Sequence, residues 1–129
     1  MKMKTSELQE EALNWAVAKC KDLQVWKSRG GWLVFESYDC SEFRNDSDDS
    51  NWQRFCPTYD WSQGGSIIER YGIELNRYAG EWMATLAGRV SVSEEQGPTQ
   101  LIAAMRCYVA SKLGDEVEVP DEILEGETQ

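Results

Sequence analysis

The residue best suited to hold an anion in this sequence is an arginine within an otherwise apolar run. Arg106 lies in GPTQLIAAMRCYVASKLG, residues 97–114, and its neighbours one helical turn away on either side are Ala103 and Ala110. Such small neighbours leave the guanidinium uncovered. A buried charge without a partner is strongly unfavourable, so the guanidinium needs acceptors. Two interpretations are open: an ion pair with a carboxylate such as Glu69, or a bidentate contact with the phosphate of a ligand.

The beginning of the same run offers a second feature that suits an anion. A helix that starts after Gly97-Pro98 exposes its first main-chain N–H groups near Thr99 and Gln100, with the Thr99 hydroxyl beside them. Helix N-termini of this kind accept anions because their N–H groups have no partner within the helix. Thr99 equally suits the structural role of a helix N-cap.

Tryptophan side chains supply faces on which a nucleotide base could stack. The chain has six tryptophans; Trp61 adjoins the Gly64-Gly65 pair, and Trp82 lies in the middle of a strand-like run. Burial in the core is the alternative explanation for both rings. The predicted ligand-binding residues are Arg106, Thr99, Gln100, Trp82 and Trp61.

The side chains that usually carry catalysis or bind metal are scarce. The sequence has no histidine, which removes the commonest general base and metal ligand. Its four cysteines form no CxxC pair and are expected to be free thiols: Cys20, Cys40, Cys56 and Cys107. The acidic run with Asp46, Asp48 and Asp49 has Asn51 and Pro57 where an EF-hand needs Gly and Glu. We therefore expect a solvated loop there, and no catalytic, metal or cofactor site.

Composition limits the classes of partner. A length of 129 residues and a hydrophobic share of 41% suit a single domain with one core. The net charge of −10 argues against general binding to nucleic acid or to an anionic membrane. The sequence shows neither a transmembrane run nor a signal peptide, so a cytosolic protein is expected.

Periodicity predicts two main helices and one short one. Residues 5–23 have an apolar stripe at helical spacing, with Ser6 and Gln9 at capping-box distance. Residues 66–71 predict about two helical turns that end at Gly72, after two glycines that permit unusual backbone conformations. The last helix is expected to begin at residues 97–99, with Pro98 in its first turn, and to end at Gly114.

Strand-like alternation completes an α+β domain. Residues 30–37 predict a turn and a short strand, and residues 73–78, 79–86 and 87–92 predict a three-stranded meander with turns at Ala79-Gly80 and Ala87-Gly88. We expect a small antiparallel sheet of three to five strands with the helices packed on one face. The single domain should span residues 1–114, followed by an acidic, extended or partly disordered tail at 115–129.

Three segments resemble a known phage family. TSEL...ALNWAVAKC, DWSQGGSIIERYGIEL and GPTQLIAAMRCYVASKLGDEVEVPDEIL are similar to the NinX family of small proteins from tailed bacteriophages, in the family's order and over about half of the chain. The specific features are the two glycines, IIE and the GPTxLIAAMR run. The segment 36–56 departs from the family because it is longer and more acidic.

The resemblance implies a function. NinX-like proteins are similar to a phage anti-defence group of molecular sponges, which sequester a cyclic ADP-ribose isomer made by a TIR-domain immune enzyme, and some of which hold cyclic oligonucleotides. Similarity to that group implies that the protein acts in the host cytoplasm and forms homo-oligomers. The ligand would lie between subunits, held by arginines and an aromatic ring. Arg106 in AAMR is then the phosphate-binding arginine, and Trp82 is a candidate stacking ring.

Three functions are consistent with these residues. A sponge binds its nucleotide reversibly and without cleavage, so it needs no catalytic base. The alternative is an acidic phage protein that binds and inhibits a host protein, as a DNA mimic that presents its acidic loop and tail. The third hypothesis, an enzyme acting on nucleotides, would depend on carboxylates such as Asp60 and Glu69.

Overall fold

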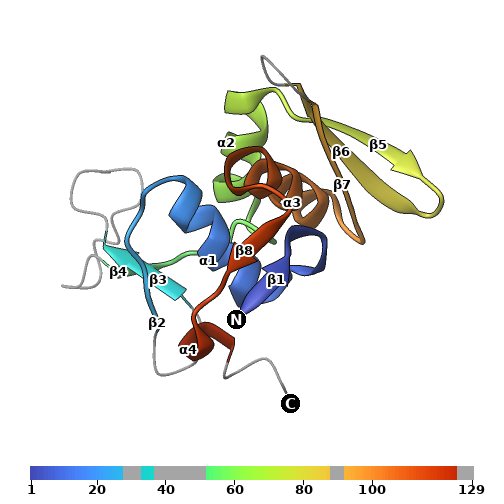
Figure 1. The fold of residues 1–129 in the computed structure, drawn as a ribbon. Coiled ribbons are helices and arrows are strands. Elements are labelled where there is room, and N and C mark those ends of the chain that lie inside the picture. The colour runs from blue at the N-terminus through green and yellow to red at the C-terminus, as the bar shows by residue number, and fades with distance from the viewer. Residues whose placement is uncertain (28–32, 37–51, 88–91, 125–129) are drawn as a thin grey trace.

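The computed structural model describes residues 1–27, 33–36, 52–87 and 92–124 of the 129-residue chain (Figure 1). The elements in these ranges follow the chain in this order: β1 (Lys2–Lys4), the 3-10 turn η1 (Thr5–Glu7), α1 (Glu10–Cys20), β2 (Trp26–Lys27), β3 (Leu33–Glu36), β4 (Trp52–Arg54), α2 (Trp61–Tyr71), β5 (Glu74–Tyr78), β6 (Glu81–Ala87), β7 (Val92–Gly97), α3 (Gln100–Leu113), β8 (Glu116–Glu118) and α4 (Asp121–Leu124). The architecture is α+β, as the sequence predicts.

The strands in the described ranges belong to three antiparallel sheets instead of the one small sheet that was expected. β1 pairs with β8, β2-β3-β4 form a second sheet, and β5-β6-β7 form the third. The third sheet is the predicted meander. Its β5-β6 hairpin extends away from the helices in Figure 1.

Helix α3 lies at the centre of the core. Ala103, Met105 and Tyr108 are fully buried, as are their neighbours Ala104, Cys107 and Val109. The helix contacts β6 and β7 on one side and both α1 and α2 elsewhere (Figure 1). Its apolar residues therefore surround most of its circumference, as expected of a helix that is covered on several sides.

The predicted ends of α3 are confirmed, with one correction. Thr99 is the N-cap, where its hydroxyl accepts from the Ile102 N–H at 3.1 Å, and Gly114 is the C-cap at φ 88°. Pro98 precedes the cap and is not in the first turn. Gly97 is needed here because a Cβ on it would lie 2.7 Å from the Ala103 nitrogen, so only glycine lets β7 run so close to α3.

The first helix starts later than predicted. α1 begins after Gln9, whose side chain makes no capping hydrogen bond, so the predicted capping box of Ser6 and Gln9 is wrong. Residues 5–7 form a 3-10 turn because Thr5 is tied to the far end of the chain. Its hydroxyl donates to the Gly114 carbonyl at 2.6 Å, and its N–H donates to the Asp115 carbonyl at 2.8 Å.

The second helix is longer than predicted. α2 begins at Trp61, because the Asp60 carboxylate caps it by accepting from the Ser62 N–H at 2.9 Å, and it ends at Gly72 with φ 66° as expected. Gly64 therefore lies within a helix and not in an unusual backbone conformation. A Cβ there would lie 2.3 Å from the Pro57 carbonyl oxygen, so glycine is required for close packing.

The meander is confirmed for two strands and shifted for the third. Ala79 and Gly80 form the two-residue turn, both at positive φ (53° and 85°), which is the type I′ geometry of tight hairpins. The third strand is β7 at Val92–Gly97, later than the predicted 87–92. Its sequence VSEEQG lacks apolar alternation because part of this strand faces solvent. Gly88 of the second predicted turn lies outside the described residues.

Residues 115–124 differ from the expected extended or partly disordered tail. β8 pairs with β1 in the register Met3↔Val117, and three side chains of this segment are buried: Val117, Val119 and Ile123. The alternation Glu116, Val117, Glu118, Val119 is the strand signal that high acidity obscured. The segment thus packs on the core, while residues 125–129 lie outside the described part.

Candidate functional site

One pocket brings together four of the five predicted ligand-binding residues. It has a volume of about 320 Å³ and is lined by eight uncharged residues, among them Tyr59 and the predicted Trp61, Trp82, Thr99 and Gln100. We call it the aromatic pocket. Trp61 is 53% exposed, so burial in the core, the alternative explanation for this ring, is excluded.

The register of the third sheet sets the position of Trp82. Trp82 pairs with Arg77 of β5 and with Gly97 of β7, so these three residues form one row across the sheet. Ala84 and Leu86, two and four residues further along β6, are buried under the helices. Because side chains alternate along a strand, Trp82 lies on this same helix-facing side, next to the start of α3.

The N-terminus of α3 forms another wall of the pocket. Thr99 is the N-cap, so its hydroxyl is already engaged by the Ile102 N–H. The main-chain N–H groups of Gln100 and Leu101 belong to the first turn and have no acceptor among the described residues. These two groups, more than the threonine hydroxyl, are available to an anion.

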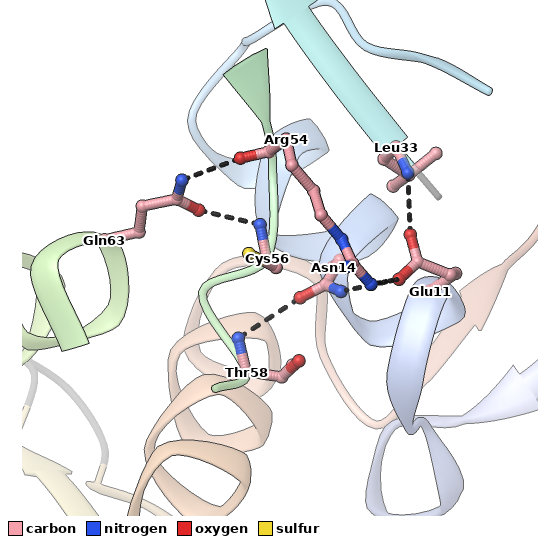
Figure 2. Close-up of polar contacts among 7 residues, drawn as sticks. All are labelled: Glu11, Asn14, Leu33, Arg54, Cys56, Thr58 and Gln63. Carbon is pink, nitrogen blue, oxygen red and sulfur yellow. Dashed lines mark hydrogen bonds and ion pairs between the residues drawn. The ribbon is translucent and has the colours of Figure 1, made fainter. Parts of the chain in front are cut away.

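A buried polar network holds the segment that leads into the pocket (Figure 2). The Asn14 side chain of α1 is fully buried, and its Oδ1 accepts from the Thr58 N–H at 3.2 Å. Asn14 Nδ2 donates to Glu11 Oε1 at 3.3 Å, and Glu11 Oε2 accepts from the Leu33 N–H at 2.8 Å. The network ties α1 both to β3 and to the segment that carries Tyr59.

Gln63 of α2 fixes the same segment from the other side (Figure 2). Its Oε1 accepts from the Cys56 N–H at 2.7 Å, and its Nε2 donates to the Arg54 carbonyl at 2.8 Å. Arg54 also approaches Glu11 at 3.9 Å. Residues 54–58 are thereby held by side chains from two helices, which preforms the wall of the aromatic pocket that Thr58 and Tyr59 supply.

Arg106, the fifth predicted residue, does not line the aromatic pocket. Its Nε donates to the Leu8 carbonyl at 2.8 Å, and one terminal nitrogen donates to the Gln96 carbonyl at 2.8 Å. The ion pair with a carboxylate such as Glu69, one of the two open interpretations, is not formed among the described residues. Both acceptors are main-chain oxygens, so the guanidinium joins the turn before α1 to the end of β7.

The surroundings of Arg106 are unfavourable for a phosphate. It lines a separate pocket of about 440 Å³ together with Glu81, Glu94 and Glu95. Burial lowers the pKa of Arg106, and the charges of Glu95 and Glu81 oppose that shift. Burial also raises the pKa of Glu95, with a contribution from Asp115. Carboxylates near the guanidinium disfavour a second anion there. Arg106 thus lies apart from the other four predicted residues, and its ligand-binding role stays a prediction.

Two other arginines lie against the rings of the aromatic pocket. The Arg77 guanidinium carbon is 5.1 Å from the centroid of the Trp82 ring, and that of Arg54 is 5.0 Å from the Tyr59 ring. Arg77 and Trp82 flank the Ala79-Gly80 turn at equal distances, so the predicted hairpin already makes them cross-strand partners. That equal spacing is the sequence signal from which Arg77 could have been identified.

The other groups that the sequence offers as candidates show no sign of a reactive site where the structure describes them. Asp60 caps α2, and Glu69 is exposed at the other end of that helix. Burial raises the pKa of the Cys20 thiol to about 11 and that of Cys107 to about 12, which keeps both thiols protonated and unreactive at neutral pH. Cys40, Asp46, Asp48 and Asp49 lie outside the described residues.

Two negative findings concern the described ranges only. Within them, no group of three or more Cys, Asp or Glu side chains is arranged to hold a metal ion. None of the helices placed there has the length and apolar character needed to cross a bilayer.

Comparison with known proteins gives one family. The family model described as bacteriophage P22, NinX matches residues 4–112, which include most of the chain and all lining residues of the aromatic pocket. A search of curated proteins finds no match.

Proposed function

The chain belongs to the bacteriophage P22 NinX family, and from that premise we propose that it is a nucleotide-binding anti-defence protein. In this proposal it sequesters a cyclic nucleotide signal of the host, a cyclic ADP-ribose isomer or a cyclic oligonucleotide, in the host cytoplasm. The aromatic pocket is the binding site. The observation that carries the proposal is the convergence of Trp61, Trp82 and the N-terminus of α3 on one cavity.

The rings and the size of the pocket support a nucleotide ligand. Its volume of about 320 Å³ is at the lower end of the range typical of small-molecule sites, roughly 300 to 1,000 Å³. A base stacked on an aromatic side chain gains about 1 to 3 kcal/mol and needs no particular hydrogen-bond pattern. Trp61 and Trp82 come from different elements, so their rings can contact two parts of one ligand.

The phosphate of the ligand has two sources of positive potential. The unpaired N–H groups of Gln100 and Leu101 lie in the wall of the pocket, at the positive end of the α3 dipole. Arg77 lies on the helix-facing side of the sheet beside Trp82 and makes no ion pair with a described carboxylate. We therefore assign the phosphate-binding role to Arg77 in place of Arg106.

The chemistry of the lining supports binding without cleavage. None of the eight lining residues is a carboxylate, an amine or a thiol, so the pocket offers neither a general base nor a strong nucleophile. A sponge must compete with a receptor, which needs about −12 kcal/mol for a nanomolar dissociation constant. A pocket wall fixed by Asn14 and Gln63 reduces the ordering cost of reaching that affinity.

The test is thermal unfolding with and without candidate ligands. A cyclic ADP-ribose isomer or a cyclic dinucleotide should raise the melting temperature, because a ligand of the native state stabilises it. Arg77→Ala should remove most of the shift, whereas Arg70→Ala, which removes an exposed arginine that lies over Tyr71 instead, should keep it. Heat-denatured protein should release the nucleotide intact; recovery of a cleaved product would show an enzyme instead.

A second candidate function is supported by one feature. Three glutamates, Glu81, Glu94 and Glu95, surround the Arg106 pocket, and the chain carries a net charge of −10. An acidic surface of this kind could bind a basic host protein as a DNA mimic does. That function predicts a complex in a pull-down from host lysate that is lost at high salt, with no shift from any nucleotide.

A further inference from the structure

The two edges of the third sheet differ in how they are covered. At the β7 edge, the outward-facing main-chain carbonyl of Gln96 accepts from the Arg106 side chain of α3 at 2.8 Å. β5 is the other edge, and no described residue makes a hydrogen bond to its free side. Figure 1 shows β5 on the outer side of the protruding hairpin, away from the helices.

The hairpin turn identifies which groups of β5 face outward. In a two-residue hairpin the residues that flank the turn, here Tyr78 and Glu81, form a hydrogen-bonded pair. Pairing alternates along the ladder, so Tyr78, Asn76 and Glu74 bond to β6. The N–H and C=O groups of Leu75 and Arg77 therefore point outward, and they form an unpaired edge of the kind that readily accepts another strand.

We propose that β5 pairs antiparallel with β5 of a second copy of this chain. Of the two-fold registers that align outward-facing groups, only the one centred on Asn76 uses both outward-facing residues of each β5: Leu75 lies opposite Arg77 of the partner subunit, and Arg77 lies opposite Leu75 of the partner subunit. The axis then passes between the two Asn76 residues. The two three-stranded sheets become one continuous sheet, with the helices of both copies on the same face.

The side chains of β5 suit this self-pairing. Asn76 lies opposite Asn76 of the partner subunit, and two primary amides can donate to and accept from one another. Glu74 lies opposite Tyr78 of the partner subunit, so no like charges face each other directly. The pairing also brings the partner's Leu75 beside Arg77, at the row that holds Trp82. The dimer does not depend on the proposed function, but it places the aromatic pockets of both copies on one face.

Opposite charges at position 75 test the register. Leu75→Glu and Leu75→Lys both remove the same partly buried side chain, but the new charge lies opposite Arg77 of the partner subunit. The Glu variant should dimerise more tightly than the Lys variant, by about tenfold or more in dissociation constant, because two symmetric cross-strand pairs change sign. Sedimentation velocity over a concentration series measures both constants. General repulsion between acidic chains would produce the reverse order.

Hydrogen exchange on the wild-type protein tests the same pairing without a mutation. The amides of Leu75 and Arg77 should become protected as the concentration rises, while those of Asn76 and Tyr78 are protected throughout by β6. A protein that stays monomeric up to millimolar concentration overturns the proposal. A dimer whose stability is the same in the two charge variants, or whose Leu75 and Arg77 amides stay unprotected, also overturns it, because the interface then lies elsewhere.

Discussion

Arg106 joins two parts of the chain that are distant in sequence. It lies on α3 and bonds to the carbonyls of Leu8 and Gln96, so it holds the turn before α1 and the end of β7 against the central helix. Its charge is balanced by those oxygens and by nearby glutamates. At this scale the residue holds distant parts of the fold together, and the proposed function assigns the ligand to the aromatic pocket instead.

Removal of Arg106 should therefore reduce stability. Arg106→Ala is expected to lower the free energy of unfolding by about 2 to 3 kcal/mol, because a hydrogen bond to a charged group contributes roughly 1.5 to 3 kcal/mol and only the bond to Leu8 is part-buried, while the bond to Gln96 is exposed and adds little. Urea denaturation measures the change. Arg70→Ala, which removes an exposed arginine, should cost about 0.5 kcal/mol or less. Equal losses of stability in the two variants would contradict the role of Arg106 in holding these segments together.

Asn14 is the second single residue on which the site depends. Asn14→Ala should destabilise the protein by about 1 to 3 kcal/mol, because it leaves the Thr58 N–H without an acceptor at a buried position. Asn14→Asp retains that acceptor but places a negative charge beside Glu11. The stability that this variant loses relative to the wild-type protein should therefore become smaller when the pH is lowered and the new carboxyl is protonated. Denaturation at pH 7 and pH 4 measures both effects. A loss in Asn14→Asp that does not change with pH would be inconsistent with the network.

At the scale of elements, two adjacent glycines of α2 have opposite roles. Gly64→Ala should destabilise the protein by about 1 to 3 kcal/mol, since its Cβ would lie 2.3 Å from the Pro57 oxygen and 2.7 Å from Leu101 Cδ2. Gly65→Ala meets only the Trp61 ring at 3.4 Å. It should stabilise the helix by about 0.5 to 1 kcal/mol through alanine's higher helix propensity. Thermal unfolding of the two variants measures both changes in stability. If both variants were stabilised, or both destabilised, the packing described would be contradicted.

Local signals in the sequence were sufficient for some elements. The N-cap at Thr99, the stop at Gly114 and the Ala79-Gly80 hairpin were all predictable, because capping and tight turns depend on neighbouring residues. The start of α2 was not, since glycine is a poor helix former and only the close contact with Pro57 explains Gly64. β8 was missed because its partner is at the opposite end of the chain.

Part of the candidate site was predictable, because some of its residues are marked by their type or by their place at a helix end. Trp61, Trp82, Thr99 and Gln100 carry their chemistry in the side-chain type or in a helix end, and the fold places them in one pocket. The partners of Arg106 are main-chain carbonyls, which no residue type marks in a sequence. A buried arginine can therefore be recognised from its neighbours, but its acceptors cannot.

For the whole molecule, stability should fall at alkaline pH. Burial raises the pKa of Cys107 from 9.0 to about 12 and that of Cys20 from 9.0 to about 11, and burial with a hydrogen bond to Tyr71 raises that of Tyr108. A group whose pKa is raised in the folded state contributes its full stability below its unfolded pKa. That contribution is lost as the pH rises from about 9 toward the folded value, because only the unfolded chain releases the proton.

Urea denaturation between pH 7 and pH 11 measures this loss. The free energy of unfolding should decline from pH 9 upward, and Cys107→Ala should make the decline less steep because one of the raised groups is gone. The variant loses some packing at every pH, so the slope and not the absolute value is compared. A slope unchanged by Cys107→Ala would show that its thiol is accessible in the folded state.

The central claim is that the ligand binds at Trp82 and not at Arg106. Calorimetric titration of a cyclic ADP-ribose isomer into Trp82→Ala and Arg106→Ala, at a temperature where both are folded, compares the two positions directly. We predict that Trp82→Ala weakens binding by about tenfold or more, as expected for the loss of a stacking ring, while Arg106→Ala binds within about threefold of the wild-type protein. Loss of binding in Arg106→Ala with wild-type affinity in Trp82→Ala, or no binding by the wild-type protein itself, would contradict it.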